Sequence, residues 1–213
     1  MGNNTDADDE VTATLDGERC VLKAYDLTNA ADRRRVEREV LRLHQLRHRH
    51  VVRVQAMFVE STAASMKAYI QMPEYKGGDL RQWLLQAGAG GPNPRTRRKL
   101  LNGLLQAVEH IHAAGVSHND MKLENVLLTE GPEDAVLSDF ELSRAVDGST
   151  LATTMVGGTP IYMAPERVRG AQPSTASDMY SLGVVLLLIH CPQLIPAVEA
   201  KPAALSVAAA IDQ

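Results

Sequence analysis

The segment from Asp178 to Ile189 restricts the fold of this chain more than any other segment. It has the composition of a helix and becomes almost entirely apolar after Ser181. A helix that is apolar on every side must be enclosed by other elements. The apolar run from Leu182 to Ile189 is also too short to cross a bilayer. We therefore expect a buried core helix and no insertion into a membrane.

The first half of the chain predicts a small sheet with one helix. Between residues 33 and 46, apolar side chains recur at the spacing of an amphipathic helix. Asp16 and Gly17 have the composition of a hairpin turn between two strands. The predicted strands are residues 11–15, 20–22, 51–59 and 68–72.

The second half of the chain is predicted to be mainly helical. Residues 96–112 carry apolar side chains at helical spacing and are followed by Gly115, a typical helix stop. Residues 126–128 and 135–137 flank a turn and predict a short hairpin. The glycine-rich residues 88–93 follow a helical segment and have an asparagine where a phosphate loop needs its third glycine, so we interpret them as a connector.

The composition excludes some classes of function. A formal net charge of -4 argues against a nucleic-acid partner, because binding to nucleic acid requires a basic face. The two cysteines, Cys20 and Cys191, lie far apart and match no metal-binding spacing. Because the N-terminus does not resemble a signal peptide, we expect a cytoplasmic protein, with the nucleus as the alternative.

Three motifs in the second half follow one another in an informative order. They are HNDMKLEN at residues 118–125, SDFE at 138–141 and GTPIYMAPE at 158–166. With a hairpin between the first two, they resemble the catalytic loop, the metal-binding motif and the end of the activation segment of eukaryotic-type serine/threonine protein kinases. Three upstream segments also resemble parts of this family. Residues 21–23 are similar to the strand that carries the ATP lysine, and residues 39–43 to the helix whose glutamate pairs with that lysine. Residues 72–80 are similar to the hinge between the two lobes.

This resemblance implies an α+β, two-lobed protein-kinase-like fold. Residues 1–10 would be a disordered lead-in, and 11–72 a partial N-terminal lobe with a small antiparallel sheet and one helix. Residues 73–191 would be a mainly helical, truncated C-terminal lobe, and 192–213 a tail. The implied activity is transfer of the γ-phosphate of ATP to a serine or threonine hydroxyl of a protein substrate.

The resemblance also implies the residues of the catalytic centre. Asp120 would accept the proton of the substrate hydroxyl, and Lys122 would neutralise charge on the transferred group. Asn125 and Asp139 would supply oxygen ligands to Mg²⁺. A lysine at position 122, together with Thr159 near the peptide site, implies serine or threonine as the acceptor.

The ATP site is implied in the same way. Lys23 would hold the α- and β-phosphates, and Glu39 would orient Lys23 through an ion pair. Asp79 would accept a hydrogen bond from the ribose. The other residues assigned to nucleotide binding are Met72, Glu74, Tyr75 and Leu127.

Each of these residues has a simpler interpretation when it is taken alone. Lys23 would be a solvated surface lysine, and Glu39 an ordinary charge on a helix. Asp120 and Asp139 would be turn or capping residues. His118, although it lies in the catalytic motif, is interpreted as a packed structural histidine.

Three departures from the family pattern leave alternative functions open. No Gly-x-Gly-x-x-Gly precedes Val11, which we expect to cost on the order of a hundredfold in rate. Asn119 replaces an arginine of the family motifs, so control through phosphorylation of Thr153 or Thr154 is not expected. Glu141 replaces a glycine, and its side chain restricts the backbone there. The chain ends soon after the core helix, so we expect a partner to cover part of that helix. The alternatives are a weak or inactive pseudokinase-like binding module and a truncated kinase fragment.

Overall fold

The computed structural model describes residues 10–15, 17–27, 29–62, 65–88, 90–131, 134–140, 144–145 and 160–200. Several predicted features lie outside these residues: the lead-in up to residue 9, Asp16, Glu141, Thr153, Thr154, Thr159 and the tail from residue 201. The chain divides into two compact units. The division falls between Glu74 and Tyr75, and Arg49–Val51 belong to the second unit.

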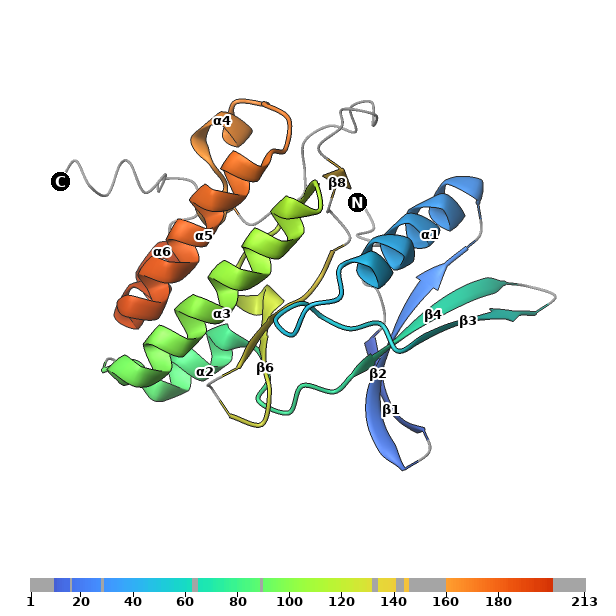
Figure 1. Cartoon of the computed structure of the whole chain (residues 1–213), viewed down its shortest axis with the longest axis horizontal. Coiled ribbons are helices and arrows are strands. Elements are labelled where there is room, and N and C mark those ends of the chain that lie inside the picture. Colours follow the sequence, from blue (N-terminus) through green and yellow to red (C-terminus); the bar gives the residue numbers. More distant parts are fainter. Residues whose placement is uncertain are drawn as a thin grey trace. The chain divides into compact units, whose positions relative to one another are not determined.

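The first unit is an antiparallel sheet of four strands with one helix. The strands are β1 (Glu10–Leu15), β2 (Glu18–Asp26), β3 (Ala56–Ser61) and β4 (Met66–Pro73), in the order β1-β2-β4-β3 (Figure 1). Helix α1 (Ala30–Gln45) packs against this sheet through the unit's core. The core consists of Tyr25, Leu27, Val36, Ala68 and Ile70.

The predicted strand over residues 51–59 is wrong in its first half. Strand β3 begins only at Ala56. Val51 instead makes a single parallel bridge to Leu137, whose N–H donates to the carbonyl of His50 at 2.9 Å. Val51 and Val52 are both buried. Their β-branched, apolar composition therefore reflects burial rather than regular strand pairing.

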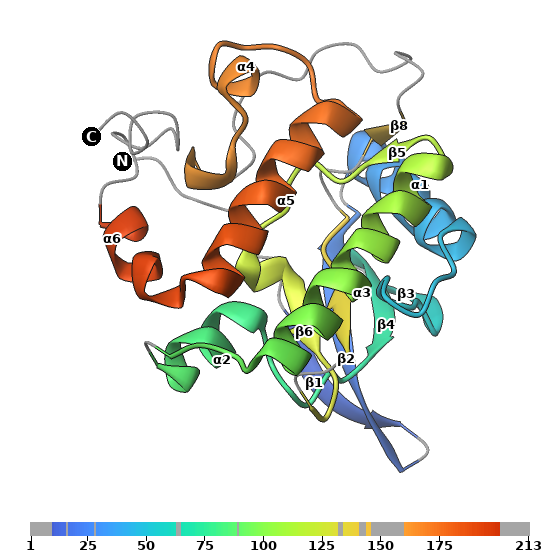
Figure 2. The same ribbon diagram turned by 60° about the vertical axis from the view of Figure 1, so that its left-hand side comes forward.

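The second unit is built around two helices and a hairpin. Helices α3 (Pro94–Ala113) and α5 (Thr175–His190) lie side by side (Figures 1 and 2). Strands β6 (Val126–Leu128) and β7 (Ala135–Leu137) form the predicted hairpin, and β7 packs on α3. The smaller elements are α2 (Leu80–Ala87), β5 (Val116–Ser117), η1 (Leu123–Asn125), β8 (Arg144–Ala145), η2 (Pro160–Tyr162), α4 (Pro165–Val168), η3 (Pro192–Leu194) and α6 (Ile195–Glu199).

Helix α5 is the core helix that the apolar run predicts. Its first turn is fixed by a capping box, in which Ser174 Oγ accepts from Ser177 N at 3.1 Å and Ser177 Oγ accepts from Ser174 N at 3.0 Å. The expected loss of cover is wrong for most of this helix, although Leu187 is 40 % exposed. The buried residues of its apolar run are Leu182, Val184, Val185, Leu188 and Ile189.

No single helix in the described part of the chain has the length and apolar composition that a membrane span requires. Only α5 together with residues Pro192–Glu199 reaches both, and these two pieces are bent by 107° at the break between them.

The glycine-rich residues 88–93 connect two helices, as predicted. Gly88, with a φ of 73°, is the C-cap of α2. Asn93 is the N-cap of α3, and its Oδ1 accepts from Arg95 N and Thr96 N, both at 3.0 Å. The asparagine that does not fit a phosphate loop therefore begins the next helix.

Candidate active site

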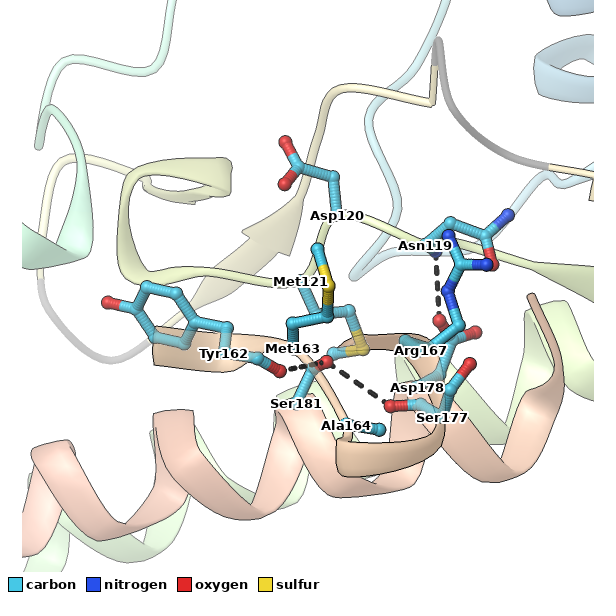
Figure 3. A pocket seen from close by; sticks show the side chains of 10 residues that line it. All are labelled: Asn119, Asp120, Met121, Tyr162, Met163, Ala164, Arg167, Ser177, Asp178 and Ser181. Carbon is cyan, nitrogen blue, oxygen red and sulfur yellow. Dashed lines mark hydrogen bonds between the residues drawn. The ribbon is translucent and has the colours of Figure 1, made fainter. Parts of the chain in front are cut away.

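The catalytic-loop motif lies between β5 and β6, and hydrogen bonds to Asp178 of α5 anchor its backbone. Asp178 Oδ1 accepts from Asn119 N at 2.8 Å, a bond drawn in Figure 3. Asp178 Oδ2 accepts from His118 N at 2.7 Å and from His112 Nε2 at 2.9 Å. Asp178 is only 1 % exposed, and a buried carboxylate needs such donors. The sequence motifs predict no role in the site for Asp178 or His112.

The backbone at Asn119 is unusual. Its φ is 71°, in the left-handed region that most side chains avoid. Asparagine adopts this region more readily than most residues. The reversal of the chain at Asn119 directs the next side chain, Asp120, away from α5 (Figure 3).

The buried carboxylate of Asp120 is held by two neighbours from its own loop. Lys122 Nζ donates to Asp120 Oδ2 at 2.7 Å. Asn125 Nδ2 donates to the same oxygen at 3.0 Å and to the backbone oxygen of Asp120 at 2.7 Å. No hydrogen bond from the described residues ends on Asp120 Oδ1. Oδ1 is thus the oxygen that can accept a proton from another molecule.

Asp139 lies two residues after the end of β7, and its neighbour Ser138 is bonded to Asn125. The adjacent Ser138 donates to the backbone oxygen of Asn125 from its N–H at 2.9 Å and from its hydroxyl at 3.0 Å. His118 Nε2 donates to Ser138 O at 2.9 Å, and the His118 ring contacts Phe140 at 4.8 Å between centroids. His118 is fully buried, which confirms its prediction as a packed structural histidine.

The two predicted metal ligands suit a hard cation. The side-chain nitrogen of Asn125 makes both hydrogen bonds to Asp120, so its carbonyl oxygen is the atom suited to a metal. Asp139 adds a carboxylate and is only partly buried. Magnesium is commonly held by one or two carboxylates together with substrate phosphates. Within the described residues, no group of three or more His, Cys, Asp or Glu side chains forms a metal cage. The metal role of both residues stays a prediction.

A pocket opens beside Asp120 in the second unit (Figure 3). Ser181 Oγ donates to Tyr162 O at 2.6 Å and so ties η2 to α5 along one wall. The pocket lining combines thioether, aromatic and methyl groups with polar and charged side chains. The lining residues are Asn119, Asp120, Met121, Tyr162, Met163, Ala164, Arg167, Ser177, Asp178 and Ser181.

Lys23 belongs to the first unit and lies on the core-facing side of β2. It shares that side of the strand with Tyr25, two residues later. Its Nζ lies 5.7 Å from the centre of the Tyr25 ring, within the range of a cation–π contact. Lys23 is buried, so it is not the solvated surface lysine of the simpler interpretation. Glu39 lies in α1, but its side chain is outside the described part of the structure, so its pairing with Lys23 stays a prediction.

The predicted hinge residues fall on both sides of the division between the units. Met72 lies in β4 and packs against the core of the first unit. Glu74 forms an ion pair with Arg19 at 2.8 Å. Tyr75 begins the second unit, and its carbonyl accepts from Gly78 N at 3.0 Å in a turn. The nucleotide contacts assigned to these residues stay predictions.

Asp79 and Leu127 lie opposite each other in the second unit. Asp79 makes an antiparallel bridge to Leu127. Its Oδ1 accepts from Gln82 N at 2.9 Å, so this carboxylate is the N-cap of α2. Capping is thus the contact that the structure gives Asp79, and its bond to the ribose stays a prediction.

Substitution of Gly77 by alanine is expected to destabilise the chain by roughly 1–3 kcal/mol through a backbone clash. Gly77 N donates to Leu128 O at 3.1 Å, and a Cβ at Gly77 would meet Thr129 O and lie 2.7 Å from Leu128 Cβ. Urea unfolding followed by circular dichroism measures the loss. Gly90→Ala is the matched control, because a Cβ there would have no atom within 4 Å. Equal unfolding midpoints for the two variants would contradict the close approach at Gly77.

The site residues therefore fall into two groups. The second unit brings together Asp120, Lys122, Asn125 and Asp139, with Tyr75, Asp79 and Leu127 in the same unit. The first unit contains Lys23, Glu39, Met72 and Glu74.

Comparison with known proteins gives one consistent result. A family model described as protein kinase domain matches residues 9–205. A bifunctional serine/threonine-protein kinase/NEDD4-like E3 ubiquitin-protein ligase of Dictyostelium discoideum is 30% identical over 82% of this chain and 9% of its own length. Calcium/calmodulin-dependent protein kinase type IV of Mus musculus is 31% identical over 78% of this chain and 34% of its own length. CBL-interacting serine/threonine-protein kinase 24 of Arabidopsis thaliana is 32% identical over 89% of this chain and 40% of its own length.

The chain spans less than half the length of these relatives. The shared region corresponds to the matched domain and not to the whole of any relative. The relatives are named as kinases, and neither their names nor the site geometry favours the pseudokinase-like alternative.

Proposed function

We propose, from the premise that this chain belongs to the protein kinase domain family, that it is a protein serine/threonine kinase that uses Mg²⁺ and ATP. The observation that carries this proposal is the arrangement around Asp120. Its Oδ2 accepts hydrogen bonds from Lys122 and Asn125, and Ser138, the residue before Asp139, donates to the backbone oxygen of Asn125. A base, a cation and two oxygen ligands therefore occur in one small region of the second unit, as phosphoryl transfer requires.

Each of these residues would contribute through position and charge. Asp120 Oδ1 would orient the substrate hydroxyl and take its proton as the bond to phosphorus forms. Lys122 lies 2.7 Å from Asp120 and would stabilise negative charge on the transferred group. Asn125 and Asp139 would hold Mg²⁺, which neutralises the phosphate oxygens when it is bound. Lys23, on the first unit, would bind the α- and β-phosphates.

Further proposals concern what surrounds the reaction. A protein segment with a serine or threonine is the proposed substrate, and Lys122 supports this choice over tyrosine by resemblance.

We propose a cytoplasmic or nuclear location, supported by Cys20 and Cys191, which are both free. Recovery of the protein in the membrane fraction of lysed cells would exclude it. A partner that covers the exposed Leu187 is proposed as well; an unchanged hydrogen-exchange rate near Leu187 in cell extract would reject it.

The parent chain is expected to transfer labelled phosphate from ATP to a generic protein substrate only when Mg²⁺ is present. ATP at about a hundred times its Kd should also stabilise the fold by roughly 2.7 kcal/mol, seen as a higher melting temperature with Mg²⁺ than with EDTA. Phosphoamino-acid analysis of the product should give phosphoserine or phosphothreonine. A folded parent that neither transfers phosphate nor responds to ATP would overturn the proposed function.

A further inference from the structure

Arg81 of α2 forms a two-point ion pair with the last residue of α6. Its Nε donates to Glu199 Oε1 at 2.6 Å, and its Nη2 donates to Glu199 Oε2 at 2.5 Å. Both side chains are partly buried. A pair of parallel N–H···O bonds fixes the plane of a guanidinium as well as its position. The guanidinium of Arg81 is therefore held in one orientation.

The same guanidinium faces a second carboxylate, which belongs to the catalytic loop. Arg81 Nε lies 3.4 Å from Glu124 Oε1. Glu124 is the middle residue of η1, between Leu123 and Asn125, both of which are buried. The other oxygen, Glu124 Oε2, is buried and makes no hydrogen bond with the described residues. Among the described residues, Arg81 is thus the only basic side chain that forms an ion pair with Glu124.

Tyr162 lies near this cluster as a buried, uncharged side chain. It is 3 % exposed, and its hydroxyl has no hydrogen bond within the described part of the chain. Burial, followed by the nearby charge of Glu124, raises the pKa of Tyr162 well above its ordinary value. The phenol therefore stays uncharged at neutral pH. Two carboxylates and one guanidinium carry the charge of the cluster, and the guanidinium links the two carboxylates.

The position of Glu124 matters because its neighbours hold Asp120. Lys122 comes two residues before Glu124 and donates to Asp120 at 2.7 Å, while Asn125 follows Glu124 and donates at 2.7 and 3.0 Å. Any rotation of η1 moves both of these donors relative to the Asp120 carboxylate. A displacement of about 1 Å in a catalytic group can cost on the order of a hundredfold in rate.

We propose that Arg81 is a positioning residue for phosphoryl transfer, which holds η1 through Glu124 while Glu199 of α6 fixes its guanidinium. The inference rests on the proposed kinase function for its effect on rate. It gives the segment after α5 a defined task, since α6 lies close to α2 (Figure 2) and supplies the anchoring carboxylate. Within the described part of the chain, Arg81 itself forms no hydrogen bond or ion pair with Asp120 or with the predicted metal ligands.

Arg81→Ala is expected to lower kcat by roughly tenfold to a hundredfold, with the KM for ATP changed much less, because positioning of the loop is lost. Arg81→Lys keeps the charge but not the two-point geometry, and it should recover part of the rate. Amide hydrogen exchange of residues 121–126 should become faster in Arg81→Ala. Arg49→Ala is the matched control, because it breaks another arginine ion pair of the second unit, that to Asp134 at 3.0 Å.

A charge exchange separates positioning from simple stability. The double variant Arg81→Glu with Glu199→Arg restores an ion pair between α2 and α6 but places a carboxylate against Glu124. Its melting temperature should be closer to that of the parent than the melting temperature of Arg81→Glu alone. Its kcat should stay low, and amide hydrogen exchange of residues 121–126 should stay fast. Full recovery of kcat in this double variant would overturn the inference.

The failure of this inference can be told apart from failure of the proposed function. An active parent whose kcat is unaffected by Arg81→Ala leaves the kinase assignment intact and overturns the role of Arg81. An inactive parent overturns the proposed function. In that case hydrogen exchange still decides whether Arg81 holds η1, since unchanged protection of residues 121–126 in Arg81→Ala would refute it.

Discussion

Asp120→Asn is expected to lower the rate of phosphate transfer by roughly a hundredfold to ten-thousandfold, the range typical of a lost general base. An amide cannot accept the proton of the substrate hydroxyl. It also meets Lys122 and Asn125, which donate to Asp120 Oδ2 at 2.7 and 3.0 Å, without the negative charge that strengthens those bonds. The measurement is the initial rate at saturating ATP and Mg²⁺ with a fixed protein substrate.

The control for this substitution is Asp134→Asn. Asp134 precedes β7 in the same unit, forms a largely exposed ion pair with Arg49 and takes no part in the predicted site. Exposed pairs of this kind contribute only about 0–1 kcal/mol, so the rate should stay close to that of the parent. Both variants should melt at nearly the same temperature. An Asp120→Asn chain that keeps the parent's rate would show that the aspartate is not the base.

Local patterns in the sequence predict most of the elements that form the site. The apolar spacing of residues 96–112 predicts α3, and the turn between residues 128 and 135 predicts the β6–β7 hairpin, with Val126 opposite Leu137 in the structure. Both depend on interactions between residues close in the sequence. Residues 51–55 are wrongly predicted as strand for the opposite reason, because Val51 and Val52 are buried and Val51 pairs with the distant Leu137.

The anchors of the catalytic loop could not be predicted in this way. Asp178 stands in the first turn of α5, where an acidic residue is normally interpreted as a charge that favours the helix N-terminus. Its role depends on contacts with His118 and Asn119, about sixty residues away. Arg81 and Glu199 are farther apart still. Ordinary surface charges give the same local pattern, so only the folded arrangement identifies these two residues.

Asn119, which replaces an arginine of the family motif, has a structural role through its backbone. The backbone there has a φ of 71° and donates to Asp178. Arginine at this position would meet the same backbone requirement at a greater conformational cost, because asparagine tolerates left-handed geometry better. The position therefore serves the loop through its main chain. The absence of control through Thr153 and Thr154 stays a prediction, since both lie outside the described residues.

Asp178→Ala is expected to have the largest effect on stability, a loss of roughly 3–5 kcal/mol, as when a buried charged partner is removed. The carboxylate accepts from two backbone amides and from His112, at 2.7 to 2.9 Å. Its removal leaves these donors without a partner in a region that water reaches poorly, and each such donor costs about 1–3 kcal/mol. A whole domain has only about 5–15 kcal/mol of stability. Urea unfolding followed by fluorescence of Trp83 measures the loss.

Two variants make the interpretation specific to this carboxylate. Asp178→Asn keeps one accepting oxygen but turns an amide group toward one of the donors, so its loss should lie between those of the parent and Asp178→Ala. Ser177→Ala removes the neighbouring capping contact, 3.0 Å from Ser174 N, and should cost about 1 kcal/mol. If Asp178→Ala unfolds no more easily than Ser177→Ala, the loop amides have found other acceptors. The catalytic loop would then be held mainly by its own contacts around Asp120 and not from α5.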